Sequence, residues 1–254
     1  MSAHLHCENV TVNFGGVVAC NKISLDVEEG KVVGLIGPNG AGKTTLFNVL
    51  SRFQNVDEGE VYLRDKPITK LKAHQIIRLG MARTFQNINL FNELTTLDNI
   101  LIGAHRLLGN PIADMLALPS ARRIEARLRD KAIELAESLH LRDELDNLVK
   151  NLPYGMQKRV ELARALAAEP EIILLDEPVA GCNDEETEEL KKTIKRVNEE
   201  FGITILLVEH DMSMVMTVCD YIHVINFGAN LAEGTPTDIQ ANNDVINAYL
   251  GEDH

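Results

Sequence analysis

The segment Gly37-Pro-Asn-Gly-Ala-Gly-Lys-Thr44 constrains this chain more than any other feature of its sequence. It fits the pattern of a glycine, four residues and then Gly-Lys-Thr, in which successive backbone N–H groups wrap around a phosphate. In that pattern Lys43 reaches the β- and γ-phosphates of a nucleotide, and the Thr44 hydroxyl binds Mg²⁺. A fortuitous glycine turn is the competing interpretation, and the flanking residues decide between the two.

The residues on either side have the pattern of a strand and a helix. Val32–Ile36 is a short apolar run rich in β-branched residues, which predicts a buried strand. From Lys43 to Phe53 the apolar residues recur at helical spacing and place Phe53 on the buried face. A helix that starts at the loop adds the positive end of its dipole. The sequence therefore predicts a nucleotide phosphate site.

A second buried strand ends in two carboxylates. Ile172–Leu175 is aliphatic throughout and is followed by Asp176 and Glu177. A carboxylate at a strand end can hold Mg²⁺ through water, and an adjacent carboxylate can polarise an attacking water. We therefore expect Asp176 to be a metal ligand and Glu177 to be catalytic, which extends nucleotide binding to nucleotide hydrolysis.

A third strand, Thr204–Val208, is followed by His210, and the amphipathic segment Glu185–Phe201 lies before it. Strands joined by crossover helices form a parallel sheet with its functional groups at the carboxyl ends of the strands. There the His210 imidazole could hydrogen-bond both the γ-phosphate and the attacking water. The predicted catalytic residues are thus Glu177, His210 and Lys43.

The middle of the chain has a helical pattern. Apolar residues recur every three or four positions from Ile124 to Leu139, and Val160–Ala168 indicates a second helix. Towards the N-terminus, Thr11–Leu25 and Glu60–Leu63 indicate strands of an antiparallel sheet. We predict one α/β domain over residues 1–254, with a mostly parallel core sheet, an N-terminal antiparallel β part and a helical insertion. The core would comprise residues 1–90 and 166–254, and the insertion about 91–165.

Composition disfavours several classes of function. The formal net charge of -13 argues against binding to a nucleic-acid backbone and against polybasic attachment to lipid. No apolar run reaches the roughly 18 residues of a spanning helix, and the N-terminus lacks an apolar signal region. We therefore expect a cytosolic chain. Cys7, Cys20, Cys182 and Cys219 are far apart in sequence, which disfavours a zinc site and favours reduced, buried thiols.

These residues together resemble the nucleotide-binding subunits of ABC transporters over essentially the whole chain. The features occur in the family's order: Phe14, Gly37–Thr44, Gln86 within Arg83–Asn87, Leu152–Gln157, Ile172–Glu177 and His210. The resemblance implies an adenine-stacking Phe14, a signature sequence at Leu152–Gln157 and a Gln86 that contacts Mg²⁺ and links to membrane domains. The implied ATP-binding residues are Phe14, Val18, Asn39, Gly40, Ala41, Gly42, Lys43, Thr44, Thr45, Gln86, Pro153 and Gly155, and the implied Mg²⁺ ligands are Thr44, Gln86 and Asp176.

Several segments narrow the resemblance to the branched-chain amino acid uptake group. They are Gly37–Asn48, Ala82–Asn87, Leu152–Gly155, Glu209–Met212 and Ala248–Gly251. ATPase subunits that serve urea or short amides, and those that serve lipopolysaccharide or lipid export, are similar and remain alternatives. The implied function is an ATPase that powers an importer of branched-chain amino acids.

Three departures from the family pattern affect this interpretation. The usual signature is Leu-Ser-Gly-Gly-Gln, whereas Pro153 here has neither a hydroxyl nor a backbone N–H, and Met156 occupies the fifth position. Cys182 and Asn183 replace the more usual Leu-Asp of the loop after the catalytic glutamate. We expect these two departures to affect contacts with an opposing subunit. Arg52 stands where glycine is usual, and we expect it to be tolerated.

The resemblance also implies partners. Two ATPase subunits, identical or paralogous, would sandwich two ATP molecules, each bound by one phosphate loop and the opposing signature. Two separate integral-membrane permeases would hold the pair at the cytoplasmic face of the cell membrane, with a solute-binding protein acting indirectly. A DNA-repair ATPase is disfavoured because the insertion is short and the chain acidic. An iron–sulfur assembly ATPase is disfavoured by Arg83–Asn87.

Overall fold

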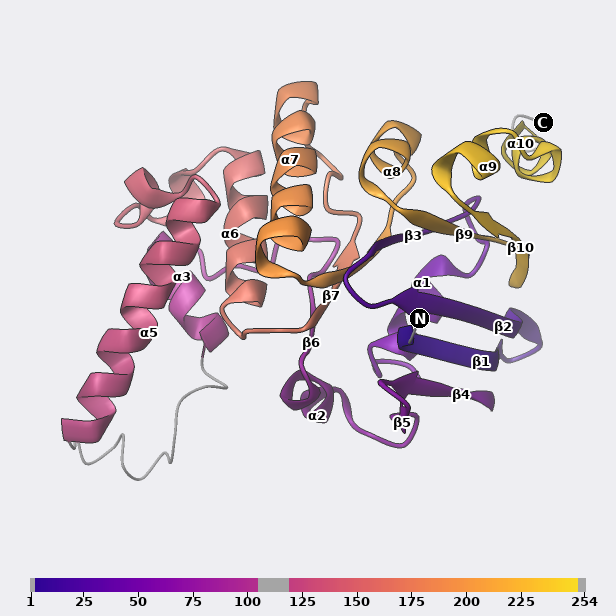
Figure 1. Ribbon diagram of the computed structural model, residues 1–254, viewed down its shortest axis with the longest axis horizontal. Coiled ribbons are helices and arrows are strands. Elements are labelled where there is room, and N and C mark those ends of the chain that lie inside the picture. Colours follow the sequence, from indigo (N-terminus) through magenta and orange to yellow (C-terminus); the bar gives the residue numbers. More distant parts are fainter. Residues whose placement is uncertain (1–2, 105–118, 251–254) are drawn as a thin grey trace.

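The computed structural model describes residues 3–104 and 119–250 and contains two β-sheets (Figure 1). The larger sheet has six strands in the order β10-β9-β3-β8-β7-β6. Neighbours from β9 to β6 are parallel, and β10 is antiparallel to β9. The predicted mostly parallel core sheet is therefore confirmed. Its strands are β3 (Val32–Ile36), β6 (Met81–Arg83), β7 (Ile172–Asp176), β8 (Thr204–Val208), β9 (Tyr221–Asn226) and β10 (Ala229–Gly234).

The second sheet is antiparallel, has four strands in the order β2-β1-β4-β5, and lies in the N-terminal part of the chain. The segment Thr11–Leu25, which reads as one strand in the sequence, belongs to two. They meet at Gly15 and Gly16, whose φ angles of 54° and 113° provide the tight hairpin turn. The strands are β1 (Ala3–Phe14), β2 (Val17–Glu28), β4 (Glu58–Leu63) and β5 (Lys66–Pro67).

Helix α1 (Lys43–Leu50) packs in the apolar core that it shares with the antiparallel sheet. It ends before Phe53, which is 57% exposed, so the prediction that Phe53 lies on the buried face is wrong. The chain turns at Arg52, whose φ of 62° is left-handed and cannot continue the helix. The same angle explains why glycine is the usual residue at this position.

All of the remaining helices but α2 cover the other face of the large sheet, whereas α2 contributes Ile76 to the core that α1 occupies. Between β6 and β7 the described residues contain only helices and short 3₁₀ turns, apart from an isolated bridge between Thr95 and Leu148. The predicted insertion also includes residues 105–118, which lie outside the described residues. Helix α6 begins at Tyr154, earlier than predicted. The helices are α2 (Ala73–Ile76), α3 (Thr96–Gly103), α5 (Pro119–Ser138), α6 (Tyr154–Leu166), α7 (Asp184–Phe201), α8 (Met212–Val218), α9 (Pro236–Gln240) and α10 (Asn243–Leu250).

The large sheet is buried on both faces, which fixes the position of its functional edge. In β3, Val32 and Ile36 belong to the core beneath α3 and α5–α10, whereas Val33 and Leu35 belong to the core shared with α1. Parallel strands covered on both sides read as continuous apolar runs, which is why β3, β7 and β8 were predictable. Their carboxyl ends meet at one edge, where the phosphate loop begins.

The four cysteines carry free thiols. Cys7, Cys20 and Cys219 are buried, as expected, and Cys182 is half-buried. Burial raises the pKa of Cys7 to about 12, so this thiol is inert at neutral pH. None of the helices among the described residues has the length and apolar character needed to cross a bilayer.

Candidate nucleotide-binding and hydrolysis site

The phosphate loop lies between β3 and α1 and depends on its glycines. Gly37 and Gly42 have φ angles of 153° and 101°. A Cβ atom would lie 2.0 Å from the Ile225 carbonyl at Gly37 and 2.3 Å from the Ala19 carbonyl at Gly42. Only glycine therefore allows the loop to approach β9 and β2 so closely. At Gly40, with φ of 77°, an added Cβ would meet nothing within 4 Å, so this part of the loop faces open space.

Lys43 places its charge inside the loop. Its side chain is buried, and Nζ donates to the carbonyls of Gly37 at 2.5 Å and Pro38 at 2.8 Å. The first turn of α1 has no side-chain cap. Uncapped N–H groups at a helix N-terminus, next to an ammonium group, make an anion site. The loop therefore fits the phosphates of a nucleotide, and Thr44 is exposed beside them.

An exposed aromatic residue lies at the tip of the β1–β2 hairpin. Phe14 is 50% exposed and Val18 is 48% exposed. The hairpin borders the phosphate loop, because Gly228 donates its N–H to Ala41 at 3.0 Å and a Cβ at Gly228 would lie 3.3 Å from the Val18 carbonyl. A ring in this position is available to stack on an adenine.

Asp176, at the end of β7, is a buried carboxylate. Its Oδ2 accepts a hydrogen bond from Arg83 Nη2 at 2.8 Å. Burial raises the pKa of Asp176, and the Arg83 guanidinium offsets part of that effect. Asp176, Thr44 and Gln86 offer only oxygen donors, as Mg²⁺ prefers when phosphates complete its shell. The described residues contain no group of three His, Cys, Asp or Glu side chains suited to a metal. The oxygen donors of Asp176, Thr44 and Gln86 thus fit a Mg²⁺ ion that nucleotide phosphates also hold.

Glu177 follows Asp176, and two other predicted residues, Gln86 and His210, lie beside its carboxylate. Glu177 Oε2 accepts a hydrogen bond from Gln86 Nε2 at 2.8 Å and lies 3.8 Å from His210 Nδ1. Glu177 has a left-handed φ of 45°, which costs a non-glycine residue about 1 to 3 kcal/mol. Its N–H donates to the Val208 carbonyl at 2.9 Å, which ties this conformation to β8. Strain of this kind, at a carboxylate that two polar side chains face, is typical of a catalytic position.

Sequence reasoning missed the role of Glu209. This carboxylate is fully buried and accepts the backbone N–H groups of Val179 at 3.1 Å, His210 at 3.1 Å and Asp211 at 3.4 Å. Burial raises its pKa, and these N–H groups counteract the rise. Glu209 therefore joins the segment that carries His210 to the segment after Glu177. Its position directly after a buried strand, which it shares with Glu177, was the available signal.

The signature segment is directed towards α7 in this chain. Pro153 is the N-cap residue of α6 and offers no side-chain cap. The Gly155 N–H, expected to face an anion, donates to Glu186 Oε1 at 2.9 Å. Asn183 caps α7 by accepting the Glu186 N–H at 3.0 Å, which gives this departure from the family pattern a local role. Lys158 Nζ donates to the Gln86 carbonyl at 2.9 Å and so links α6 to the catalytic edge.

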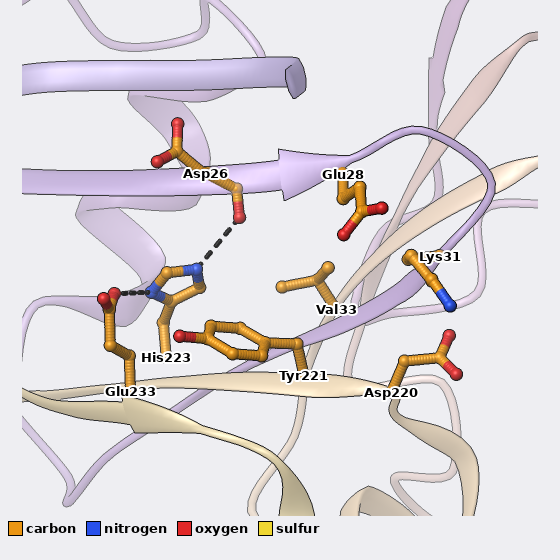
Figure 2. Close-up of a pocket in the computed structure, with 8 residues that line it drawn as sticks. All are labelled: Asp26, Glu28, Lys31, Val33, Asp220, Tyr221, His223 and Glu233. Carbon is orange, nitrogen blue, oxygen red and sulfur yellow. Dashed lines mark hydrogen bonds and ion pairs between the residues drawn. The ribbon is translucent and has the colours of Figure 1, made fainter. Parts of the chain in front are cut away.

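A separate hollow of about 530 Å³ lies at the opposite edge of the sheet, where β3 and β9 begin (Figure 2). His223 is 2% exposed there, with Nδ1 3.1 Å from Glu233 and Nε2 2.9 Å from the Asp26 carbonyl. The histidine therefore joins β9 to β10 and β2. Because the phosphate loop follows the other end of β3, this hollow is not part of the nucleotide site.

Comparisons with known proteins agree with this geometry. Residues 20–180 match the family model described as ABC transporter, and residues 229–254 match that of the branched-chain amino acid ATP-binding cassette transporter. Two similar relatives are high-affinity branched-chain amino acid transport ATP-binding proteins: BraF of Pseudomonas aeruginosa, 45% identical, and LivG of Escherichia coli, 43% identical. Each alignment covers 98% of both chains. The lipopolysaccharide export ATP-binding protein LptB of Escherichia coli is 34% identical over 99% of this chain and 98% of its own.

Solved structures lead to the same family. The ATP-binding cassette MJ1267 in its ADP conformation superposes with a TM-score of 0.86 at 32% identity, covering 99% of both chains. A dimeric post-hydrolysis state of the cassette MJ0796, bound to ADP and phosphate, gives 0.75 at 27% identity over 91% of this chain and 98% of the other. The chain belongs to the ABC transporter family, in the group of ATP-binding, ATP-hydrolysing subunits related to those of branched-chain amino acid transport.

Proposed function

We propose that this chain hydrolyses ATP at the cytoplasmic face of the cell membrane to power the import of branched-chain amino acids. The observation that carries hydrolysis is the convergence of Gln86 and His210 on Glu177, at the edge where the phosphate loop begins. The solute assignment is supported by 45% identity to BraF, against 34% to the exporter subunit LptB. Import is therefore favoured over lipopolysaccharide or lipid export. The match of residues 229–254 to the branched-chain amino acid cassette model favours amino acids over urea or amides.

In the proposed reaction Glu177 orients the attacking water and accepts its proton, while His210 holds the water and the γ-phosphate in line. Lys43 and the N–H groups of the loop stabilise the charge that spreads over the transferring phosphoryl group. Thr44, Asp176 and Gln86 would hold Mg²⁺, which when bound neutralises charge on the β- and γ-phosphate oxygens.

The other half of each site would come from a second ATPase subunit, a copy or a paralogue. Phe14 and Val18 would bind adenine, and the first-turn residues Thr44 and Thr45 the phosphates. Pro153 and Gly155 would face ATP bound to the partner. The dimer reported for MJ0796 supports such an arrangement. The remaining loop residues proposed to contact ATP are Asn39, Gly40, Ala41 and Gly42.

The permeases would dock next to Gln86. Phe53 and Phe85 are 57% and 37% exposed and form an edge-to-face pair with ring centroids 5.7 Å apart. Phe91, in the segment after Gln86, is 53% exposed. Exposed aromatic rings on an acidic chain indicate a surface that another protein covers. We propose that two membrane permeases bind here and that a solute-binding protein acts only through them. The helical insertion, about residues 91–165, would move against a core of residues 1–90 and 166–254.

Affinity purification of the tagged chain from detergent-solubilised native membranes tests this proposal. We expect two permeases and a second ATPase to co-purify, and ATPase activity in reconstituted vesicles to rise with a binding protein loaded with leucine. Urea, short amides and lipopolysaccharide are the comparison substrates. Stimulation by one of these alone would reject the amino acid assignment, and recovery of only soluble partners would reject the transporter assignment.

A further inference from the structure

Arg83 connects the end of β6 with two elements of the nucleotide site. Its guanidinium Nη2 donates to Asp176 Oδ2 at 2.8 Å. Its Nη1 donates to Asn48 Oδ1 at 2.8 Å and to Ser51 Oγ at 2.6 Å, both from the segment of α1 and its C-terminal end. The side chains of Arg83 and Asp176 are only 10% and 9% exposed, so this ion pair is shielded from water.

Aromatic rings surround the same guanidinium. Arg83 Cζ lies 4.8 Å from the ring centroid of Phe47 and 5.3 Å from those of Phe53 and Phe85. Phe47 is buried in the core, whereas Phe53 and Phe85 form the exposed pair described above. The guanidinium therefore lies between Asp176 and a surface pair of rings, which stabilise a desolvated cation.

The contacts of Arg83 fix the orientation of the Asp176 carboxylate, which goes beyond neutralising its charge. A buried carboxylate needs a partner, and an ammonium group could supply one. The planar guanidinium donates in fixed directions, and here it is held by α1 at one nitrogen while it holds Asp176 with the other. One carboxylate oxygen is thereby engaged, which leaves Oδ1 for the hydration shell of Mg²⁺.

We propose that Arg83 is a positioning residue that fixes the Asp176 carboxylate for Mg²⁺ and ties its position to the Phe53–Phe85 surface. This inference rests on the proposed assignment of Asp176 to Mg²⁺. Groups that orient a metal ligand typically contribute about 10- to 100-fold to metal affinity. Loss of Arg83 should therefore weaken Mg²⁺ binding while leaving the phosphate loop able to bind nucleotide.

The test measures equilibrium binding of a fluorescent methylanthraniloyl-ATP to the full chain, first in EDTA and then with increasing Mg²⁺. For Arg83→Gln we expect binding in EDTA within about twofold of the unmodified chain, but a Mg²⁺ requirement raised about tenfold. The Mg²⁺ requirement of Arg83→Lys should lie between those of Arg83→Gln and the unmodified chain, because lysine keeps the charge but lacks the planar set of guanidinium donors. Arg196→Gln, whose guanidinium instead binds the Ser138 carbonyl at 2.8 Å, is the matched control and should leave the Mg²⁺ requirement unchanged.

An unchanged or lowered Mg²⁺ requirement in Arg83→Gln would overturn the inference. If that variant does not fold, Phe85→Ala decides, since it removes an exposed ring that touches the guanidinium but is not bonded to Asp176. It should raise the Mg²⁺ requirement by a smaller factor, and no change would count against the inference. If the unmodified chain binds nucleotide without any Mg²⁺ effect, the assignment of Asp176 to Mg²⁺ fails, and the inference fails with it. If every variant keeps the Mg²⁺ dependence of the unmodified chain, only the positioning role of Arg83 is rejected.

Discussion

At the scale of single residues, Glu177 combines backbone strain with converging polar contacts. Its left-handed φ of 45° persists because its N–H is bonded to Val208 and its carboxylate faces Gln86. Replacing Glu177 by Gln preserves the size and hydrogen-bonding capacity of the side chain and removes the base. We expect ATPase activity to fall about 10²- to 10⁴-fold while ATP binding persists.

The measurement for Glu177→Gln pairs a phosphate-release assay with size-exclusion chromatography in ATP. The variant should accumulate as an ATP-bound dimer. Glu199→Gln, at an exposed position of α7, provides a charge-matched control that should behave like the unmodified chain. Retained hydrolysis, or a variant that stays monomeric in ATP, would remove Glu177 from its proposed role.

Arg52 shows what a sequence can and cannot predict about one residue. The motif pattern identified a position where glycine is usual, and the structure gives it a left-handed φ of 62°. The compensation could not be predicted in full, because it combines two nearby residues with the Leu71 carbonyl, which lies 19 residues further along the chain. The guanidinium donates to the carbonyls of Leu71 at 3.3 Å and Gln54 at 3.2 Å, and to Asn55 Oδ1 at 3.1 Å. Three hydrogen bonds offset the strain of the backbone.

At the scale of elements, Glu186 joins the N-termini of α6 and α7. Its Oε1 accepts the Gly155 N–H at 2.9 Å, and its Oε2 accepts the Asn183 N–H at 3.1 Å. Replacing Glu186 by Ala leaves two N–H groups without their acceptor, each worth about 0.5 to 2 kcal/mol. We therefore expect the free energy of unfolding to fall by about 1 to 3 kcal/mol.

Urea unfolding followed by circular dichroism measures this difference. Glu185→Ala is the matched control, because Glu185 lies in the same first turn of α7 and is exposed. It should cost only the smaller interaction of a charge with the helix dipole. Equal losses in the two variants would show that the bond to Gly155 contributes nothing to stability.

Strands that are buried along their whole length could be predicted from the sequence. Strands β3, β7 and β8 are buried along their whole length and appear as aliphatic runs, so their bounds followed from the sequence. Strand β9 interrupts its apolar pattern with His223, which is buried because Glu233 and the Asp26 carbonyl lie beside its nitrogens. Such partners come from other strands, and no local pattern identifies them.

At the scale of the whole molecule, the residues proposed for one ATP site are divided between two chains. The phosphate loop and Glu177 lie at the edge of the core sheet, whereas Pro153 and Gly155 lie at the start of α6, directed towards Glu186 of α7. The Gly155 N–H is bonded to Glu186 Oε1 within the chain, so the proposed contact with the partner's ATP requires Glu186 to release it. In the proposed arrangement each chain completes a site only by pairing. The pairing half is the harder one to derive from the sequence, because its proposed ligand belongs to another subunit.

This division predicts that hydrolysis by the isolated chain depends on its own concentration. If two chains must meet around ATP, the rate per chain should be low in a dilute, strictly monomeric sample and rise towards a plateau as protein is added. Steady-state phosphate release across a hundredfold range of protein concentration, with light scattering to follow the dimer, gives both quantities. The Lys43→Ala chain has an intact signature but no working phosphate loop. When it is added to a dilute sample of the unmodified chain, the rate of ATP hydrolysis should rise. A high rate that is constant at every concentration would mean that one chain holds a complete site.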